Sequence, residues 1–250
     1  MSEDVDDRPL VAVFRPDDER TDEAIAVLEA RSAEPLADPM LAIEPTGASP
    51  ASDAEIVILT SKTGVECAVA AGWSPGEATL CCIGPRTARA AEAAGWTVEL
   101  VPDEYTSSGL VSFLEDEIEG VRIEVARSDH GSDVLLEGLE AAGAIVHETI
   151  LYRLVRPAGA GQSTKAAAAG ELDAALFTSS LTVEHFLAAA EERGIESATL
   201  EGLDRAVVGA IGDPTAETAA AHGIDVDVVA SEATFEILAD EVLAELRGRS

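Results

Sequence analysis

Hydroxyl side chains recur at two points in the chain where apolar, strand-like runs end. They are Thr60 and Ser61 in the first half, and Thr178, Ser179 and Ser180 in the second. A hydroxyl at such a point can hydrogen-bond a bound carboxylate, or it can cap the helix that follows. No histidine stands beside either group and there is no nucleophile-elbow pattern, so a hydrolase triad is not expected.

A Gly-x-x-Thr-Ala motif also occurs in each half, between a strand-like and a helix-like segment. Its residues are Gly84, Thr87 and Ala88 in the first half, and Gly212, Thr215 and Ala216 in the second. Glycine permits a tight turn, threonine can cap a helix, and a helix N-terminus offers free N–H groups to an anion. The motifs indicate either a carboxylate or phosphate cradle or ordinary strand-to-helix turns. Neither is a P-loop or a dinucleotide fingerprint.

The chain is strongly acidic, with 48 acidic and 16 basic residues and a formal charge of −32. Its few cations are therefore informative. Five of them fall at or just beyond the C-terminal ends of apolar runs: Arg15, Lys62, Arg86, Arg127 and Arg153. Ligands of open α/β sheets bind at that edge. Each cation alone suits a surface ion pair, but the set favours an anionic ligand.

Tyr152 is one of two tyrosines and lies in the long strand-like run 144–155. A phenol there could donate a proton to a leaving hydroxyl while its ring packs on an aromatic ligand, although a half-buried strand tyrosine fits equally well. The three cysteines and four histidines have no metal-ligand spacing, so we expect no metal site.

The composition excludes several classes of protein. A surface of this charge repels nucleic acid and anionic lipid, and it is typical of proteins that stay hydrated at high salt, as in halophiles. No apolar run approaches the ~20 residues of a membrane span. The acidic N-terminus lacks a signal-peptide core, and the odd cysteine count suits a reducing compartment. We therefore expect a cytoplasmic protein.

The elements that must position these residues alternate regularly. We expect strands at 10–15, 55–59, 79–83, 97–101, 121–126, 144–155, 173–177, 206–211 and 225–229, with a short extended piece at 40–43. We expect helices at 18–31, 63–71, 86–94, 107–118, 132–142, 181–193, 214–221 and 233–247. This alternation predicts parallel sheets with helices on both faces.

The chain is also internally duplicated. The paired motifs above recur in the same order, and Val11–Arg15 matches Ile123–Arg127. The order is A-B-A′-B′, where A supplies two strands and B three, which fits five-stranded flavodoxin-like sheets. A could pair with B, or A with B′ while B pairs with A′. Linkers at 41–54 and 148–161 favour the second arrangement.

Taken together, these segments resemble the uroporphyrinogen-III synthase family over nearly the whole chain. The likeness rests on Arg15-Pro16, Thr60-Ser61 with Gly64-Val65, Gly84-x-x-Thr87-Ala88 with Gly95, Arg127-Ser128-Asp129, Leu151-Tyr152, Thr178-Ser179-Ser180, and Gly212-x-x-Thr215-Ala216 with Gly223. Ser32 departs from the pattern, because it stands where a glycine commonly precedes the second strand, so the register of 33–45 is open.

The resemblance implies two flavodoxin-like domains with a cleft between them. One domain comprises 1–40 and 159–250, the other 47–147, and linker strands at 41–46 and 148–158 join them. It also implies a cofactor-independent hydro-lyase, which cyclises hydroxymethylbilane to uroporphyrinogen III with inversion of the last pyrrole ring and loss of water. Tyr152 is then the catalytic candidate. The alternative is a non-catalytic binding or sensor protein for an anionic small molecule.

The only partner expected is the linear tetrapyrrole substrate, and we expect a monomer. The expected substrate contacts are Arg15, Thr60, Ser61, Lys62, Gly84, Arg86, Thr87, Arg127, Thr178, Ser179, Ser180, Gly212 and Thr215.

Overall fold

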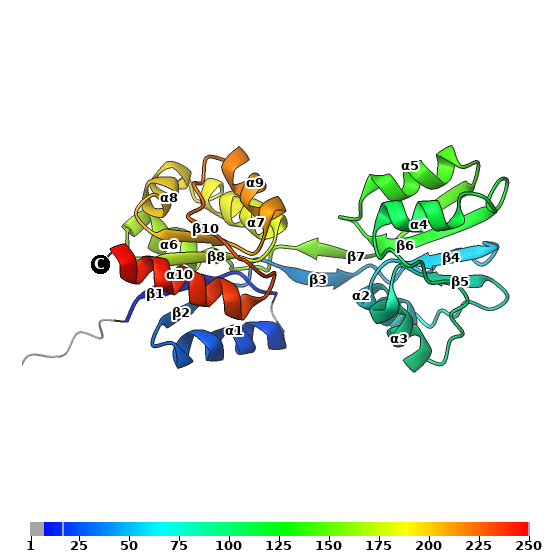
Figure 1. The fold of residues 1–250 in the computed structure, drawn as a ribbon, viewed down its shortest axis with the longest axis horizontal. Coiled ribbons are helices and arrows are strands. Elements are labelled where there is room, and N and C mark those ends of the chain that lie inside the picture. Colours follow the sequence, from blue (N-terminus) through cyan, green and yellow to red (C-terminus); the bar gives the residue numbers. More distant parts are fainter. Residues whose placement is uncertain (1–7, 17, 250) are drawn as a thin grey trace, which may run out of the picture. The chain divides into compact units, whose positions relative to one another are not determined.

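The structure is a computed structural model that describes residues 8–16 and 18–249, which form two compact units (Figure 1). The described residues up to Ala42 and from Val155 onwards form unit 1, and Ile43–Leu154 forms unit 2. Each unit has its own five-stranded sheet with helices on both faces.

Unit 1 is built on a sheet with the strand order β10-β9-β8-β1-β2. Its strands are β1 (Leu10–Val13), β2 (Glu34–Ala37), β8 (Ala174–Phe177), β9 (Val207–Ala210) and β10 (Val228–Val229). Its helices are α1 (Glu19–Ala30), α6 (Gln162–Ala169), α7 (Ser180–Glu191), α8 (Glu196–Leu203), α9 (Asp213–Ala221) and α10 (Phe235–Arg249). All neighbouring strands are parallel. Strands β8 and β9 are buried along their whole length, as parallel strands covered on both faces must be.

Unit 2 is built on a sheet with the strand order β3-β7-β6-β4-β5. Its strands are β3 (Ala42–Pro45), β4 (Ile56–Leu59), β5 (Thr79–Cys82), β6 (Arg122–Ser128) and β7 (Ile145–Val155). Its helices are α2 (Lys62–Ala70), α3 (Pro85–Ala93), α4 (Ser107–Leu114) and α5 (Asp133–Ala141). Strands β5, β4, β6 and β7 are parallel, so their carboxyl ends lie at one edge.

The sheet of unit 1 combines strands that precede unit 2 in the sequence with strands that follow it. Strand β1 pairs with β8, with Val11 opposite Ala174, whereas β4 pairs with β6, with Ile56 opposite Ile123. The strand order within unit 1 is the flavodoxin order, and the predicted class of two parallel α/β sheets is confirmed.

Two of the predicted strands, 97–101 and 225–229, are reduced the most, and for the same physical reason. Residues 97–101 form only one bridge, between Cys81 and Leu100, because the Glu99 carboxylate takes the Leu80 N–H at 2.8 Å. In unit 1 the Asp227 carboxylate takes the Val208 N–H at 2.8 Å, and β10 begins only at Val228. A carboxylate bound to a strand N–H replaces a backbone partner and cuts the ladder short.

Strand β2 lies within 33–45, the stretch whose register the sequence left open, and it contains Pro35. It is an edge strand, where the missing N–H of proline removes no ladder bond that the sheet needs. Ser32, just before it, has a left-handed φ of 62°, so here a serine adopts the conformation that glycine adopts most easily. Helices α6 and α8 were also not predicted.

A buried carboxylate ties together the two stretches of unit 1 that border unit 2 in the sequence. Asp38, 4% exposed, accepts hydrogen bonds from the N–H of Gly161 at 2.8 Å and of Ser163 at 2.8 Å, and from the Ser163 hydroxyl. Gly161 is the N-cap of α6 and has no side chain to cap it. Asp38 therefore caps α6 from a distant part of the chain.

We expect Asp38→Ala to lower the free energy of unfolding of unit 1 by about 2–4 kcal/mol, because it leaves buried donors without acceptors. Urea unfolding followed by circular dichroism measures this. The matched control is Asp204→Ala, which removes an exposed aspartate of the same unit and should change stability by less than about 0.5 kcal/mol. Equal effects of the two variants would contradict the capping role of Asp38.

Candidate active site

The predicted catalytic tyrosine and one of the predicted hydroxyls meet at the carboxyl edge of the unit 2 sheet. The Tyr152 hydroxyl lies 3.0 Å from Ser61 Oγ, and either atom can be the donor. Ser61 follows β4 and caps α2 by accepting the Gly64 N–H at 2.9 Å. Tyr152 is 7% exposed. This hydrogen bond connects two residues 91 positions apart.

Tyr152 turns inward because β7 contains a β-bulge. The pairing of β6 with β7 shifts by one residue, so that Arg127 lies opposite Ile150 but Ser128 lies opposite Tyr152. Leu151 is the extra residue. Leu151 and Tyr152 are both buried in the same core cluster, although adjacent residues of a regular strand face opposite ways.

A pocket of about 200 Å³ opens at the same edge. It is lined by Thr60, Ile83, Ser107, Arg127, Gly131, Ser132 and Leu135. Ser107 is the first residue of α4 and Ser132 is the N-cap of α5, so hydroxyls and helix N-termini surround it. The sequence analysis missed both serines. The available signal was their place at the starts of two predicted helices.

Arg127 lines this pocket but is held by neighbouring groups. Its side chain is 5% exposed, and Nε donates to Glu148 Oε1 at 2.5 Å while Nη1 donates to the Ser132 carbonyl at 2.6 Å. Nη2 has a looser partner, the exposed Asp133 carboxylate at 3.6 Å. Arg127 therefore mainly holds Glu148 and the Ser132 carbonyl in place at this edge of the sheet. Its Nη2 is the atom best placed to meet an anion.

The other predicted residues of unit 2 lie around the starts of α2 and α3. Lys62 is exposed and pairs with Glu66 at 3.1 Å, one turn further along α2. Thr87 is buried. Gly84 is the N-cap of α3, and a Cβ there would lie 3.2 Å from Tyr105 Cβ, so the tyrosine packs directly on the glycine. Arg86 is exposed and has no ion pair among the described residues.

In unit 1 the corresponding edge holds Arg15, which follows β1. Its guanidinium lies 5.1 Å from the centre of the Phe235 ring, a cation–π contact. Burial, and after it the charge of Arg20, lower the pKa of Arg15 from its ordinary value. Arg15 Nε is buried and has no hydrogen-bond partner within the described part of the chain. Its guanidinium is thus a cation that this edge can offer to an anion.

The predicted hydroxyls of unit 1 are largely engaged in holding helices. Ser179 caps α7 in a reciprocal capping box with Thr182. Ser180 donates to the Pro214 carbonyl at 3.0 Å. Thr178 Oγ1 lies 3.5 Å from the Phe14 carbonyl, and Thr215 is 4% exposed.

The two Gly-x-x-Thr turns differ in charge. The turn that begins at Gly84 has Arg86 in the first turn of its helix, whereas the turn that begins at Gly212 is followed by the exposed Asp213. A carboxylate beside a helix N-terminus competes with an incoming anion. The start of α3 is therefore the better anion site of the two.

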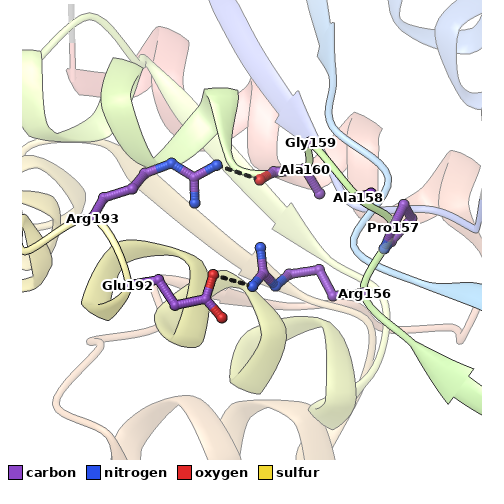
Figure 2. Close-up of a pocket in the computed structure, with 7 residues that line it drawn as sticks. All are labelled: Arg156, Pro157, Ala158, Gly159, Ala160, Glu192 and Arg193. Atoms are coloured by element: carbon purple, nitrogen blue, oxygen red, sulfur yellow. Dashed lines mark hydrogen bonds and ion pairs between the residues drawn. The ribbon is translucent and has the colours of Figure 1, made fainter.

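A second pocket, of about 440 Å³, lies in unit 1 beside residues 157–160 (Figure 2). Arg156 pairs with Glu192, and Arg193 donates to the Ala160 and Ala189 carbonyls, each at 2.6 Å. These bonds fasten the segment that follows β7 to the end of α7.

The cysteines are not placed for nucleophilic chemistry. Burial raises the pKa of Cys81 and that of Cys82 to about 12, so both remain thiols at neutral pH. Within residues 8–16 and 18–249, no three His, Cys, Asp or Glu side chains gather as metal ligands would. None of the described helices is both long and apolar enough to pass through a bilayer.

The fold, with a five-stranded α/β sheet in each of its two units, places the chain among two-domain α/β proteins. Solved uroporphyrinogen III synthases share it. A mutant of the Thermus thermophilus enzyme has a TM-score of 0.66 at 20% identity, covering 97% of this chain and 100% of that one. The Helicobacter pylori enzyme has a TM-score of 0.62 at 15% identity, covering 95% of this chain and 99% of that one.

Sequence comparison defines the family. The model of the family described as uroporphyrinogen-III synthase HemD matches residues 22–240. A putative uroporphyrinogen-III synthase of Methanothermobacter thermautotrophicus is 34% identical over 86% of this chain and 90% of its own length. The uroporphyrinogen-III synthase of Synechococcus elongatus is 27% identical over 74% of this chain and 73% of its own length. The chain belongs to the uroporphyrinogen-III synthase family.

Proposed function

We propose that this chain cyclises hydroxymethylbilane to uroporphyrinogen III. Family membership supports the reaction, and the hydrogen bond between Tyr152 and Ser61 supports the place of the chemistry. The terminal C–O bond of the substrate breaks, and the hydroxyl leaves as water once it has gained a proton. The last pyrrole ring attacks the resulting cation through its substituted α-carbon, which gives a spiro intermediate. The original bridge bond of that carbon then breaks and re-forms at the free α-carbon of the same ring, which inverts the ring, and loss of a proton from this carbon restores the pyrrole.

Tyr152 is the proposed donor of the proton to the leaving hydroxyl. Ser61 Oγ already accepts the Gly64 N–H, and its own proton can point to the phenol oxygen. In that arrangement the Tyr152 proton is free to be donated, and the Ser61 hydroxyl stabilises the negative charge that develops on the phenol oxygen. The proton released on ring closure restores the phenol.

The remaining contribution of the protein is positioning. Closure without inversion is facile, so an enzyme for the type III isomer must hold one folded conformation of a reactive cation. We include the other predicted edge residues of both units among the substrate contacts, with Arg86 and Arg15 as cations for its carboxylates. The pocket beside Arg127 suits a single carboxylate arm, because hydroxyls and Nη2 line it.

We further infer that the enzyme works in the cytoplasm as a monomer, with a linear tetrapyrrole as its only partner. Its three cysteines are free, as in a reducing compartment.

The function is tested by supplying hydroxymethylbilane to the purified protein and separating the cyclic products by isomer. We expect the type III isomer to predominate, whereas the substrate alone gives type I. A product that remains entirely type I, with substrate bound, would instead support a non-catalytic binding protein.

Tyr152→Phe should lower kcat by about tenfold or more and leave KM within about twofold, because it removes a proton donor but keeps the ring. Steady-state kinetics with hydroxymethylbilane measure both constants. Unchanged kcat in a folded variant would remove Tyr152 from the mechanism.

Arg86→Gln should raise KM by about three- to tenfold with little change in kcat, since the exposed guanidinium attracts a substrate carboxylate near the start of α3. The effect should shrink as salt screens the charge. The control is Arg122→Gln, which removes the same charge from the first residue of β6, at the opposite edge of the sheet, where Arg122 pairs with Glu55 at 3.4 Å. If both variants raise KM equally, net charge and not a local contact is responsible.

A further inference from the structure

The β-bulge that turns Tyr152 inward is held from both sides by side chains outside the proposed chemistry. On one side, Thr46 follows β3 and donates its hydroxyl to the Ile150 carbonyl at 2.7 Å, with the Leu151 carbonyl at 3.1 Å. The Thr46 N–H also donates to the Leu151 carbonyl, at 3.0 Å. Thr46 therefore bonds the carbonyls of the extra residue, Leu151, and of the residue before it.

On the other side, Asp129 fixes the residues that follow the bulge. Its Oδ1 accepts the Leu154 N–H at 3.0 Å, and its own N–H donates to the Tyr152 carbonyl at 3.3 Å. The same Oδ1 lies 2.9 Å from His130 Nδ1. Burial would raise the pKa of Asp129, but the hydrogen bonds from His130 and Leu154 outweigh it and the pKa is lowered. The carboxylate is therefore charged at neutral pH and accepts both bonds.

The bulge matters because it decides which way Tyr152 faces. Without the extra residue, Leu151 and Tyr152 would point to opposite faces of β7, and the Tyr152 hydroxyl would leave Ser61 Oγ. The backbone of 150–154 is thus bonded by Thr46 at its beginning and by Asp129 at its end, with Tyr152 between them.

We propose that Asp129 and Thr46 are positioning residues that hold the β7 bulge and thereby aim the Tyr152 hydroxyl at Ser61 and at the leaving group. This inference rests on the proposed function, because it assigns the two residues a task in the reaction through Tyr152. Neither residue needs to touch the substrate.

The test is a double-mutant cycle with Tyr152→Phe. Asp129→Ala and Thr46→Val should each lower kcat by about three- to tenfold while KM stays within about twofold, because a misaimed donor slows the chemical step. In the Tyr152→Phe background the same substitutions should change kcat by less than about twofold, since there is no hydroxyl left to aim.

Asp129→Asn provides a rescue. The amide oxygen can still accept the Leu154 N–H, so this variant should recover most of the kcat lost in Asp129→Ala. Thr46 is exposed, so Thr46→Val keeps the test open if Asp129→Ala does not fold. Matched controls are Asp116→Ala and Thr97→Val, which remove an exposed aspartate and an exposed threonine of the same unit. Both controls should leave kcat unchanged.

The proposal is overturned if the single variants keep full kcat, if their losses multiply undiminished with Tyr152→Phe, or if Asp129→Asn is as impaired as Asp129→Ala. Multiplying losses would mean that the two residues support the fold only, while the proposed function stands. A wild-type protein that yields no type III isomer, or an active Tyr152→Phe variant, would instead show that the proposed function or the role of Tyr152 fails.

Discussion

The pairing of β1 with β8 is the constraint on which unit 1 depends. These strands lie at the centre of its sheet, and Phe14, just after β1, stacks on Phe177, at the end of β8, with ring centres 4.6 Å apart. Strand β2 is attached to the sheet only through β1, and β9 through β8, so without this pair the sheet falls into two unconnected parts. Beside the sheet, the Asp38 carboxylate links the same two stretches of unit 1, because it accepts the Gly161 and Ser163 N–H groups where the chain returns from unit 2.

The candidate site shows how such a fold can act without a reactive cluster. Ser61 and Ser179 are engaged in helix caps, Ser180 is bonded to a carbonyl, and Arg127 is engaged with Glu148, so few strong groups remain free. What remains is one phenol–hydroxyl pair, backbone N–H groups at helix starts, and a few cations. Many weak contacts suit a reaction whose difficulty is conformational, because positioning alone can lower a barrier by several kcal/mol.

Much of this architecture could be predicted from the sequence. Strand-like and helix-like segments alternate regularly, and the motifs between them are duplicated, which is typical of two parallel sheets. The failures have local causes. The register of β2 stays open in the sequence because Ser32 stands where a glycine is usual, and the side chains of Glu99 and Asp227 shorten strands whose apolar pattern looks complete. Tyr152 and Ser61 could each be proposed from their places in the chain. Their contact could not, because it depends on a one-residue bulge that the strand pattern of 144–155 does not reveal.

The crossed pairing has a consequence during translation. Leu10 donates its N–H to Asp173, 163 residues later, so β1 leaves the ribosome long before β8 exists, while all of unit 2 is made in between. An unpaired apolar strand is an aggregation hazard for as long as it waits. Acidic residues follow β1 closely, among them Asp18, Glu19, Asp22 and Glu23, and charges beside an apolar strand oppose such aggregation. The order of synthesis therefore gives the charge next to β1 a use before the sheet is complete.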